Sequence, residues 1–266
     1  MEMIRLVLRL TLFSAFLLAT ALIAVSCLIA ETVTRRAIDR APIARFCFHG
    51  ASRCLGLRIR QQGLPASGPV LLVSNHISWS DIPVLGGATP LRFLSKAEVS
   101  RWPVIGWLAR QAGTLFIVRG GGRAREARRE ITSVLSGGQS VLVFPEGTTS
   151  SGLSVLPFHS RLLQAAPEAG VAIQGISIGY TRQGRPDHLT PFIGDDEFQS
   201  HLPRLLRHPA VDVTVIFHPP IQVDGNRPLT EVTEQLRETI AAGVQQIYQA
   251  RAMEANKEGA EAIRHA

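Results

Sequence analysis

The stretch Val70–Pro83 reads VLLVSNHISWSDIP and passes from four apolar residues directly into a polar run. The apolar part is too short to cross a membrane and is rich in β-forming residues, so it predicts a buried strand. The polar residues then lie at the carboxyl end of that strand, which is where α/β sheets bind their ligands. This stretch therefore predicts both a sheet and the position of a site on it.

His76 and Asp81 carry the chemistry of this stretch. Five residues correspond to about 140° around a helix, so a regular helix would not bring the two side chains together. Ser80 or Asp81 followed by Pro83 predicts that a helix begins after a turn. The carboxylate could then hold the imidazole in one tautomer, which a general base needs to accept a proton from a hydroxyl. Taken alone, the pair also fits a structural hydrogen bond in a loop.

Three further apolar runs end in polar residues, as Val70–Val73 does. They are Gly113–Arg119 (GTLFIVR), Val141–Ser150 (VLVFPEGTTS) and Val171–Tyr180 (VAIQGISIGY). Other strand-forming runs are found at residues 57–62, 92–99 and 212–217, with helical patterns at 123–136 and 230–249. Strands separated by helical segments predict an α/β fold, with a mixed, largely parallel sheet flanked by helices and an N-terminal membrane-associated helical segment.

Three motifs follow one another along the chain: N-H-x4-D at 75–81, G-x-x-F-I-x-R at 113–119 and F-P-E-G-T-T-S at 144–150. Together they resemble the glycerolipid acyltransferase family, most closely the bacterial 1-acylglycerol-3-phosphate acyltransferases. The resemblance covers roughly residues 56–220. It implies an enzyme that takes an acyl group from acyl-CoA or acyl carrier protein as co-substrate, with no cofactor. No metal is expected, because a thioester is already activated.

The resemblance gives Arg119 the role of binding the acceptor's phosphate. A guanidinium group suits this role because its planar fork matches phosphate oxygens, although a solvated arginine at a strand end is the simpler interpretation. Lys96 stands near the end of another predicted strand, where the family commonly carries a lysine. We count it among the substrate-binding candidates.

The loop after Val141–Phe144 supplies four more substrate-binding candidates. Gly147 would let the backbone approach a ligand, and the hydroxyls of Thr148 and Thr149 could hold phosphate oxygens. Glu146 would repel a phosphate, so we expect it to grip the acceptor's free hydroxyl or to organise Arg119.

Residues 194–206 contain GDDE followed by HLPRLL, a segment that resembles one in bacterial lysolipid acyltransferases, including those of lyso-ornithine lipid. We predict acyl transfer to the free hydroxyl of a lysolipid, with 1-acyl-sn-glycerol-3-phosphate as the first acceptor and lyso-ornithine lipid as the alternative. A non-catalytic membrane module that binds lipid or CoA is the competing class. Ser78 and Ser80 do not indicate a serine hydrolase, because the G-x-S-x-G turn is missing.

Leu10–Ala30 contains no charged residue and is about long enough to cross a hydrocarbon core of roughly 30 Å. More arginines follow this run than precede it, which places the catalytic domain on the cytoplasmic side of the inner membrane. Whether the run spans the bilayer or dips into one leaflet stays open. Residues 34–55 combine arginines with phenylalanines and predict an interfacial helix.

The chain of 266 residues carries a net charge of +7 and is 45% hydrophobic. This surplus suits membrane lipids, a nucleotide-bearing thioester or an acidic carrier protein, while nothing in the sequence resembles a nucleic-acid-binding motif. We expect a membrane anchor and interfacial segment at 1–55, an acyltransferase domain at 56–250 and a flexible tail at 251–266. Cys27, Cys47 and Cys54 lack metal or disulfide spacing, so we expect buried or lipid-facing thiols.

Overall fold

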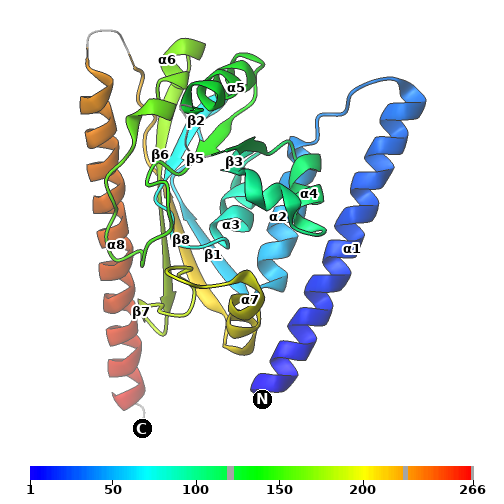
Figure 1. Cartoon of the computed structure of the whole chain (residues 1–266). Helices are drawn as coiled ribbons and strands as arrows, with labels where there is room; N and C mark the ends of the chain where they lie inside the picture. The colour runs from blue at the N-terminus through cyan, green and yellow to red at the C-terminus, as the bar shows by residue number, and fades with distance from the viewer. Residues whose placement is uncertain (119–122, 224–226, 265–266) are drawn as a thin grey trace.

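The computed structural model describes residues 1–118, 123–223 and 227–264, with side chains described as far as Glu254. Its centre is an eight-stranded sheet in the order β1-β8-β6-β2-β5-β3-β4, with β7 paired to β6 (Figure 1). The strands are β1 (Leu57–Gln62), β2 (Val70–Ser74), β3 (Arg92–Lys96), β4 (Leu115–Ile117), β5 (Val141–Val143), β6 (Ala172–Arg182), β7 (Arg185–Pro186) and β8 (Val211–Phe217).

Most neighbouring strands run parallel, which confirms the predicted mixed, largely parallel sheet. The parallel pairs are β1 with β8, β2 with β5 and β6, and β3 with β4 and β5. Only β6 with β8 and β6 with β7 are antiparallel among the described strands. The carboxyl ends of β2, β5 and β3 therefore meet at one edge, as the motif positions require.

Helices cover both faces of the sheet (Figure 1). They are α1 (Glu2–Thr34), α2 (Ala41–Cys54), α3 (Asp81–Ala88), α4 (Ile105–Gln111), α5 (Ala124–Ser136), α6 (Ala165–Ala169), α7 (Phe198–Arg207) and α8 (Leu229–Arg264), with 3-10 turns at Ala97–Arg101 and Ser160–Leu162. One core packs α1, α3 and α7 against the sheet, and the other packs α5, α6 and α8 against the opposite face.

Strand β2 contributes to both cores. Val70 and Leu72 belong to the core on the α3 side, whereas Leu71 and Val73 belong to the core on the α8 side. Successive side chains of a strand point to opposite faces, so a strand buried on both faces must be apolar throughout. This explains the uninterrupted apolar run that the sequence shows.

The ends of the chain are more helical than expected. Helix α1 begins at Glu2, well before the uncharged run at Leu10. Helix α8 continues to Arg264, through the tail that we expected to be flexible. That tail contains several alanines and glutamates, which are strong helix formers, and this propensity outweighs its lack of apolar periodicity. Cys27 and Cys47 are buried free thiols, as predicted.

Asn75 continues the pairing of β2 with β6 beyond the point where β2 ends. Its side-chain amide donates to the Ile178 carbonyl at 2.9 Å, and its side-chain oxygen accepts the Ile178 N–H at 2.9 Å. Asn75 is only 1% exposed and Ile178 is fully buried, so these polar groups are shielded from water. The side chain thus holds the loop that follows β2 against β6.

Asn75→Ala should lower the free energy of unfolding by about 2 to 4 kcal/mol, because it leaves the buried N–H and carbonyl of Ile178 without hydrogen-bond partners. Chemical denaturation in detergent micelles measures this change. Gln139→Ala is the control, since it removes a surface amide that bonds Asp39 and should change stability by less than about 0.5 kcal/mol. Equal stabilities of the two variants would contradict this role of Asn75.

Candidate active site

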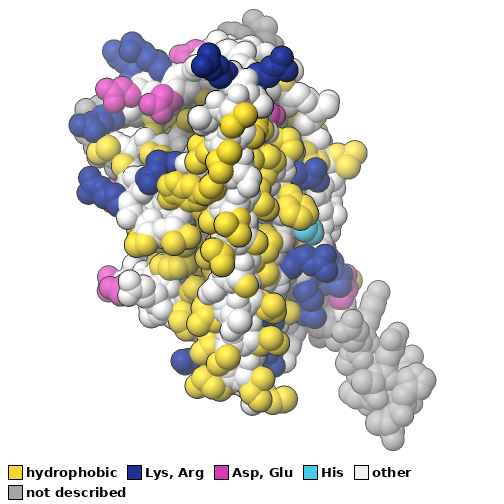
Figure 2. Space-filling view, turned by 90° about the vertical axis from the view of Figure 1, so that its right-hand side faces the viewer, with side chains coloured by type: hydrophobic (Ala, Val, Ile, Leu, Met, Phe, Trp, Pro, Cys, Tyr) yellow, Lys and Arg dark blue, Asp and Glu magenta, His cyan; other side chains and the backbone are white. Residues whose placement is uncertain are grey.

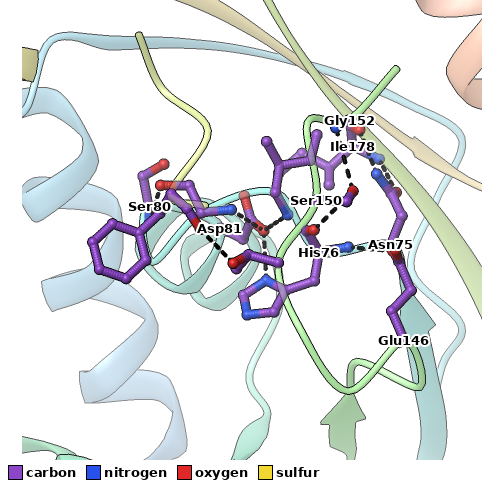
Figure 3. A network of polar contacts seen from close by, with 12 residues as sticks. Asn75, His76, Ser80, Asp81, Glu146, Ser150, Gly152 and Ile178 are labelled. Atoms are coloured by element: carbon purple, nitrogen blue, oxygen red, sulfur yellow. Dashed lines mark hydrogen bonds and ion pairs between the residues drawn. The ribbon is translucent and has the colours of Figure 1, made fainter. Parts of the chain in front are cut away.

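A tight turn between β2 and α3 brings His76 and Asp81 together (Figure 3). Asp81 is the first residue of α3 and is fully buried. Its Oδ2 atom accepts from His76 Nδ1 at 2.8 Å, from the Ile77 N–H at 2.7 Å and from the Ser78 N–H at 3.1 Å. Three donors on one oxygen determine the path of the turn, and the predicted contact between the two side chains is present.

The imidazole of His76 is held on one edge and on one face. Because a carboxylate accepts at Nδ1, that nitrogen carries a proton and Nε2 has the lone pair. Nε2 points away from Asp81 (Figure 3). Phe144 stacks on the ring with centroids 3.9 Å apart, and the His76 side chain is 20% exposed. The ring is therefore oriented by protein contacts while it keeps access to solvent, as a general base requires.

Glu146 supports the backbone of His76. Its Oε1 accepts the His76 N–H at 2.8 Å and its Oε2 accepts the Leu156 N–H at 3.1 Å. From the same loop, the Ser150 N–H donates to the His76 carbonyl at 2.9 Å. The loop after β5 therefore binds both polar backbone groups of His76. The expected contact of Glu146 with the acceptor stays a prediction, and the structure adds this supporting role.

Burial raises the pKa of the Glu146 carboxyl to about 7, against two backbone hydrogen bonds that lower it. The nearby negative charge of Asp81 raises this pKa further. Glu146 is 5% exposed, so little water reaches it. A carboxyl group of this kind changes its charge near neutral pH.

The other predicted substrate-binding residues have different surroundings. Gly147 has φ +72°, a conformation that favours glycine, and it lies beside the His159 ring. Thr148 is exposed, whereas the hydroxyl of Thr149 donates to the Phe192 carbonyl. Lys96 ends β3 and is exposed.

Arg119 lies outside the described residues, so its phosphate-binding role stays a prediction.

Two residues that the sequence analysis does not assign to the site help to build it. Asn75 holds the loop, and Tyr180 donates its hydroxyl proton to Asp81 Oδ1 at 2.7 Å. Tyr180 stands out as the one aromatic residue in the apolar run Val171–Tyr180. A buried tyrosine usually finds a hydrogen-bond partner, so this residue type was a usable signal.

The chain is similar to known acyltransferases. A family model described as Acyltransferase matches residues 57–179. The lyso-ornithine lipid O-acyltransferase of Pseudomonas aeruginosa is 47% identical over 194 residues, which are 73% of each chain. The chain belongs to the glycerolipid acyltransferase family. The 1-acyl-sn-glycerol-3-phosphate acyltransferase of Neisseria meningitidis is 36% identical over 140 residues, covering 50% of this chain and 55% of that protein.

The fold of this acyltransferase has a counterpart among solved structures. The crystal structure of PlsC, the 1-acyl-sn-glycerophosphate acyltransferase from Thermotoga maritima, superposes with a TM-score of 0.67. The match covers 93% of this chain and 98% of that one, at 23% sequence identity. The predicted family and fold are both confirmed, and the protein is an acyltransferase.

The raised pKa of Glu146 predicts how stability depends on pH. An acid whose pKa rises on folding binds more protons in the folded state, so the free energy of unfolding falls as pH increases through its titration range. From the ordinary value of 4.5 to about 7, this loss amounts to about 3 kcal/mol between roughly pH 4 and pH 8. Denaturation at a series of pH values measures it.

Glu146→Gln separates this contribution from those of other groups, because the amide does not titrate. The variant should become more stable relative to the parent protein as pH rises. Parallel pH profiles for the two proteins would contradict the assignment.

Proposed function

We propose that this enzyme moves a fatty acyl group from acyl-CoA or acyl carrier protein to the free hydroxyl of a lysolipid at a membrane. The observation that carries the proposal is the 2.8 Å contact of His76 with a fully buried Asp81 at the catalytic edge. Membership of the acyltransferase family and the lysolipid acceptors named for its relatives support it.

The geometry suits direct transfer. His76 Nε2 takes the proton of the acceptor hydroxyl while Asp81 stabilises the resulting imidazolium. The acceptor oxygen attacks the thioester carbonyl carbon, the carbon–sulfur bond breaks, and the leaving thiolate takes the proton from the imidazolium. Ser78 and Ser80 are both fully buried, and the hydroxyl of Ser80 donates to Tyr180. Neither serine is placed as a nucleophile.

His76→Ala and Asp81→Ala should each lower kcat by roughly 10²- to 10⁴-fold, because a general base contributes about that much. Release of free thiol from the acyl donor measures the rate, and flotation with vesicles checks that each variant still binds membranes. His188→Ala, which removes an exposed histidine, is the control. Normal turnover by His76→Ala would refute the mechanism. A protein that binds lysolipid but releases no thiol would be a binding module.

Lyso-ornithine lipid is the acceptor that the relatives support best. The similarity to the lyso-ornithine lipid enzyme covers 73% of this chain at 47% identity, against 50% of the chain at 36% for the glycerol-phosphate enzyme. A second enzyme named for lyso-ornithine lipid, from Brucella abortus, is 38% identical over 73% of this chain. The phosphate acceptor, which the sequence analysis placed first, becomes the second candidate and is kept because the F-I-x-R motif supplies Arg119.

Arg119→Ala discriminates between the two acceptors. The KM for 1-acyl-sn-glycerol-3-phosphate should rise at least about tenfold, because a charge-assisted contact with phosphate is lost. The KM for lyso-ornithine lipid, which lacks phosphate, should change little. Thiol release with both lipids gives the two values, and Arg125→Ala on the exposed face of α5 serves as the control. The unmodified enzyme's preference in this assay decides which acceptor is the better substrate.

Helix α1 offers an apolar surface to a membrane (Figure 2). It is 33 residues long, with a mean hydropathy of 2.5 over its most apolar window. Large apolar side chains are exposed along its whole length: Met3, Ile4, Val7, Leu8, Leu10, Leu12, Leu18, Leu22, Ile23, Val25, Leu28, Ile29 and Val33. Figure 2 shows them as a continuous band on the side that faces away from the sheet.

Both ends of α1 are attached to the catalytic domain. Near its start, Arg5 donates to the Arg207 carbonyl at 2.9 Å and Arg9 donates to the His208 carbonyl at 2.8 Å, at the end of α7. Near its end, Glu31 pairs with Arg40, which also donates to the Gln111 side chain of α4 in the catalytic domain. A helix of this length measures about 50 Å, so a perpendicular span would place these two contacts on opposite sides of a bilayer. If α1 instead lies in the plane of the membrane, inserted into the cytoplasmic leaflet, the contacts at its start and at its end are both kept.

Cysteine labelling tests this arrangement. In a Cys27→Ala, Cys47→Ala, Cys54→Ala background, Glu2→Cys and Arg36→Cys should react with an impermeant maleimide from the same side of sealed vesicles. That side should be the cytoplasmic one. Labelling of the two sites from opposite sides would instead establish a transmembrane helix.

A further inference from the structure

The carboxylate of Asp81 is held through both of its oxygens, and the second oxygen has a single described partner. Oδ2 receives the imidazole and two backbone N–H groups, whereas Oδ1 receives the Tyr180 hydroxyl at 2.7 Å. Tyr180 lies on β6 and is 1% exposed. A residue 99 positions along the chain thus completes the coordination of the catalytic carboxylate.

The direction of the Tyr180 hydrogen bond is fixed by a further residue. The Ser80 hydroxyl donates to the Tyr180 phenol oxygen at 3.0 Å, so the phenol uses its own proton on Asp81. Ser80 is fully buried, and it lies directly before Asp81 in the chain. The order of donation is Ser80 to Tyr180 to Asp81 to His76, and each of these contacts lies within hydrogen-bond distance.

We propose that Tyr180 is a positioning residue for acyl transfer, which holds the Asp81 carboxylate and moderates the basicity of His76. This inference rests on the proposed function, in which His76 is the general base. Three donors on Oδ2 leave the carboxylate able to pivot about that atom, and the phenol removes this freedom. A neutral donor also stabilises the carboxylate charge, so it reduces the pull of Asp81 on the imidazolium proton.

A tyrosine that served only to fill the core would not need its hydroxyl on the Asp81 carboxylate. The ring of Tyr180 packs in the core on the α3 side, and a phenylalanine would fill the same space. The hydroxyl is what the site uses, because its partner is the carboxylate that holds His76. The titratable groups that face Asp81 are His76 from the turn, Glu146 from the loop after β5, Tyr180 from β6 and Tyr248 from α8.

Tyr180→Phe tests the proposal, and Tyr248→Phe is a matched control because these are the two tyrosines of the chain. Tyr248 is partly buried, and its hydroxyl bonds the backbone of Tyr180 rather than the Asp81 carboxylate. Tyr180→Phe should lower kcat about tenfold, the effect of losing one hydrogen bond to a charged group. The KM values for donor and acceptor should stay within about twofold, since neither substrate touches the phenol. Tyr248→Phe should change none of these.

The pH profile separates positioning from packing. Without the phenol, Asp81 attracts the imidazolium proton more strongly, so the acidic limb of the kcat profile should move to higher pH in Tyr180→Phe. The titration of the His76 ring by NMR should move in the same direction. A variant that melts at a lower temperature but keeps the parent kcat and His76 titration would overturn the proposal.

Two further variants keep the outcome decisive. If Tyr180→Phe does not fold, Ser80→Ala removes only the donor to the phenol and should give a smaller fall in kcat and a smaller pH shift in the same direction. An unchanged profile there would overturn the proposal. Adding Tyr180→Phe to Asp81→Asn should cost little more than Asp81→Asn alone, because coupled residues are not additive. Full activity of His76→Ala would instead contradict the proposed function itself. In that case the NMR titration of His76, compared between the parent protein and Tyr180→Phe, would still show whether Tyr180 acts on the His76–Asp81 pair.

Discussion

One buried oxygen atom, Oδ2 of Asp81, determines the shape of the site. An ionised carboxylate without exposure to water is costly unless donors surround it, and here the imidazole and two backbone N–H groups do so. These donors belong to residues 76–78, so the turn can satisfy the charge only by closing on itself. The same hydrogen bonds that stabilise the buried charge of Asp81 also orient the ring of His76.

The sheet and the His76–Asp81 pair were predictable because their signals are local. An apolar run predicts a strand buried on both faces, and Pro83 near Ser80 predicts where α3 begins. The partners of these residues were not predictable, since Tyr180 reaches Asp81 only through the neighbouring position of β6 and β2. The partners of Glu146 were equally unpredictable. Its carboxylate accepts from two backbone N–H groups only because the loop after β5 folds back toward His76.

Helix α7 lies between the turn that carries His76 and the apolar helix α1. Trp79, inside the turn, donates its indole N–H to His201 Nδ1 at 3.1 Å. Since Nδ1 accepts, the His201 proton is on Nε2 and is donated to the Pro191 carbonyl at 3.2 Å. Burial lowers the pKa of His201, which keeps the ring neutral and preserves this pattern. The residue is therefore a fixed structural link rather than a second base.

The other end of α7 completes the connection. The carbonyls of Arg207 and His208 have no partner in the helix, and the guanidinium groups of Arg5 and Arg9 on α1 bind them. A helix that carries an apolar outer band is thus joined, through α7 and Trp79, to the turn that holds His76. The apolar band of α1 and the His76 ring are therefore held in one frame, and the proposed transfer to a lysolipid at a membrane requires such an arrangement.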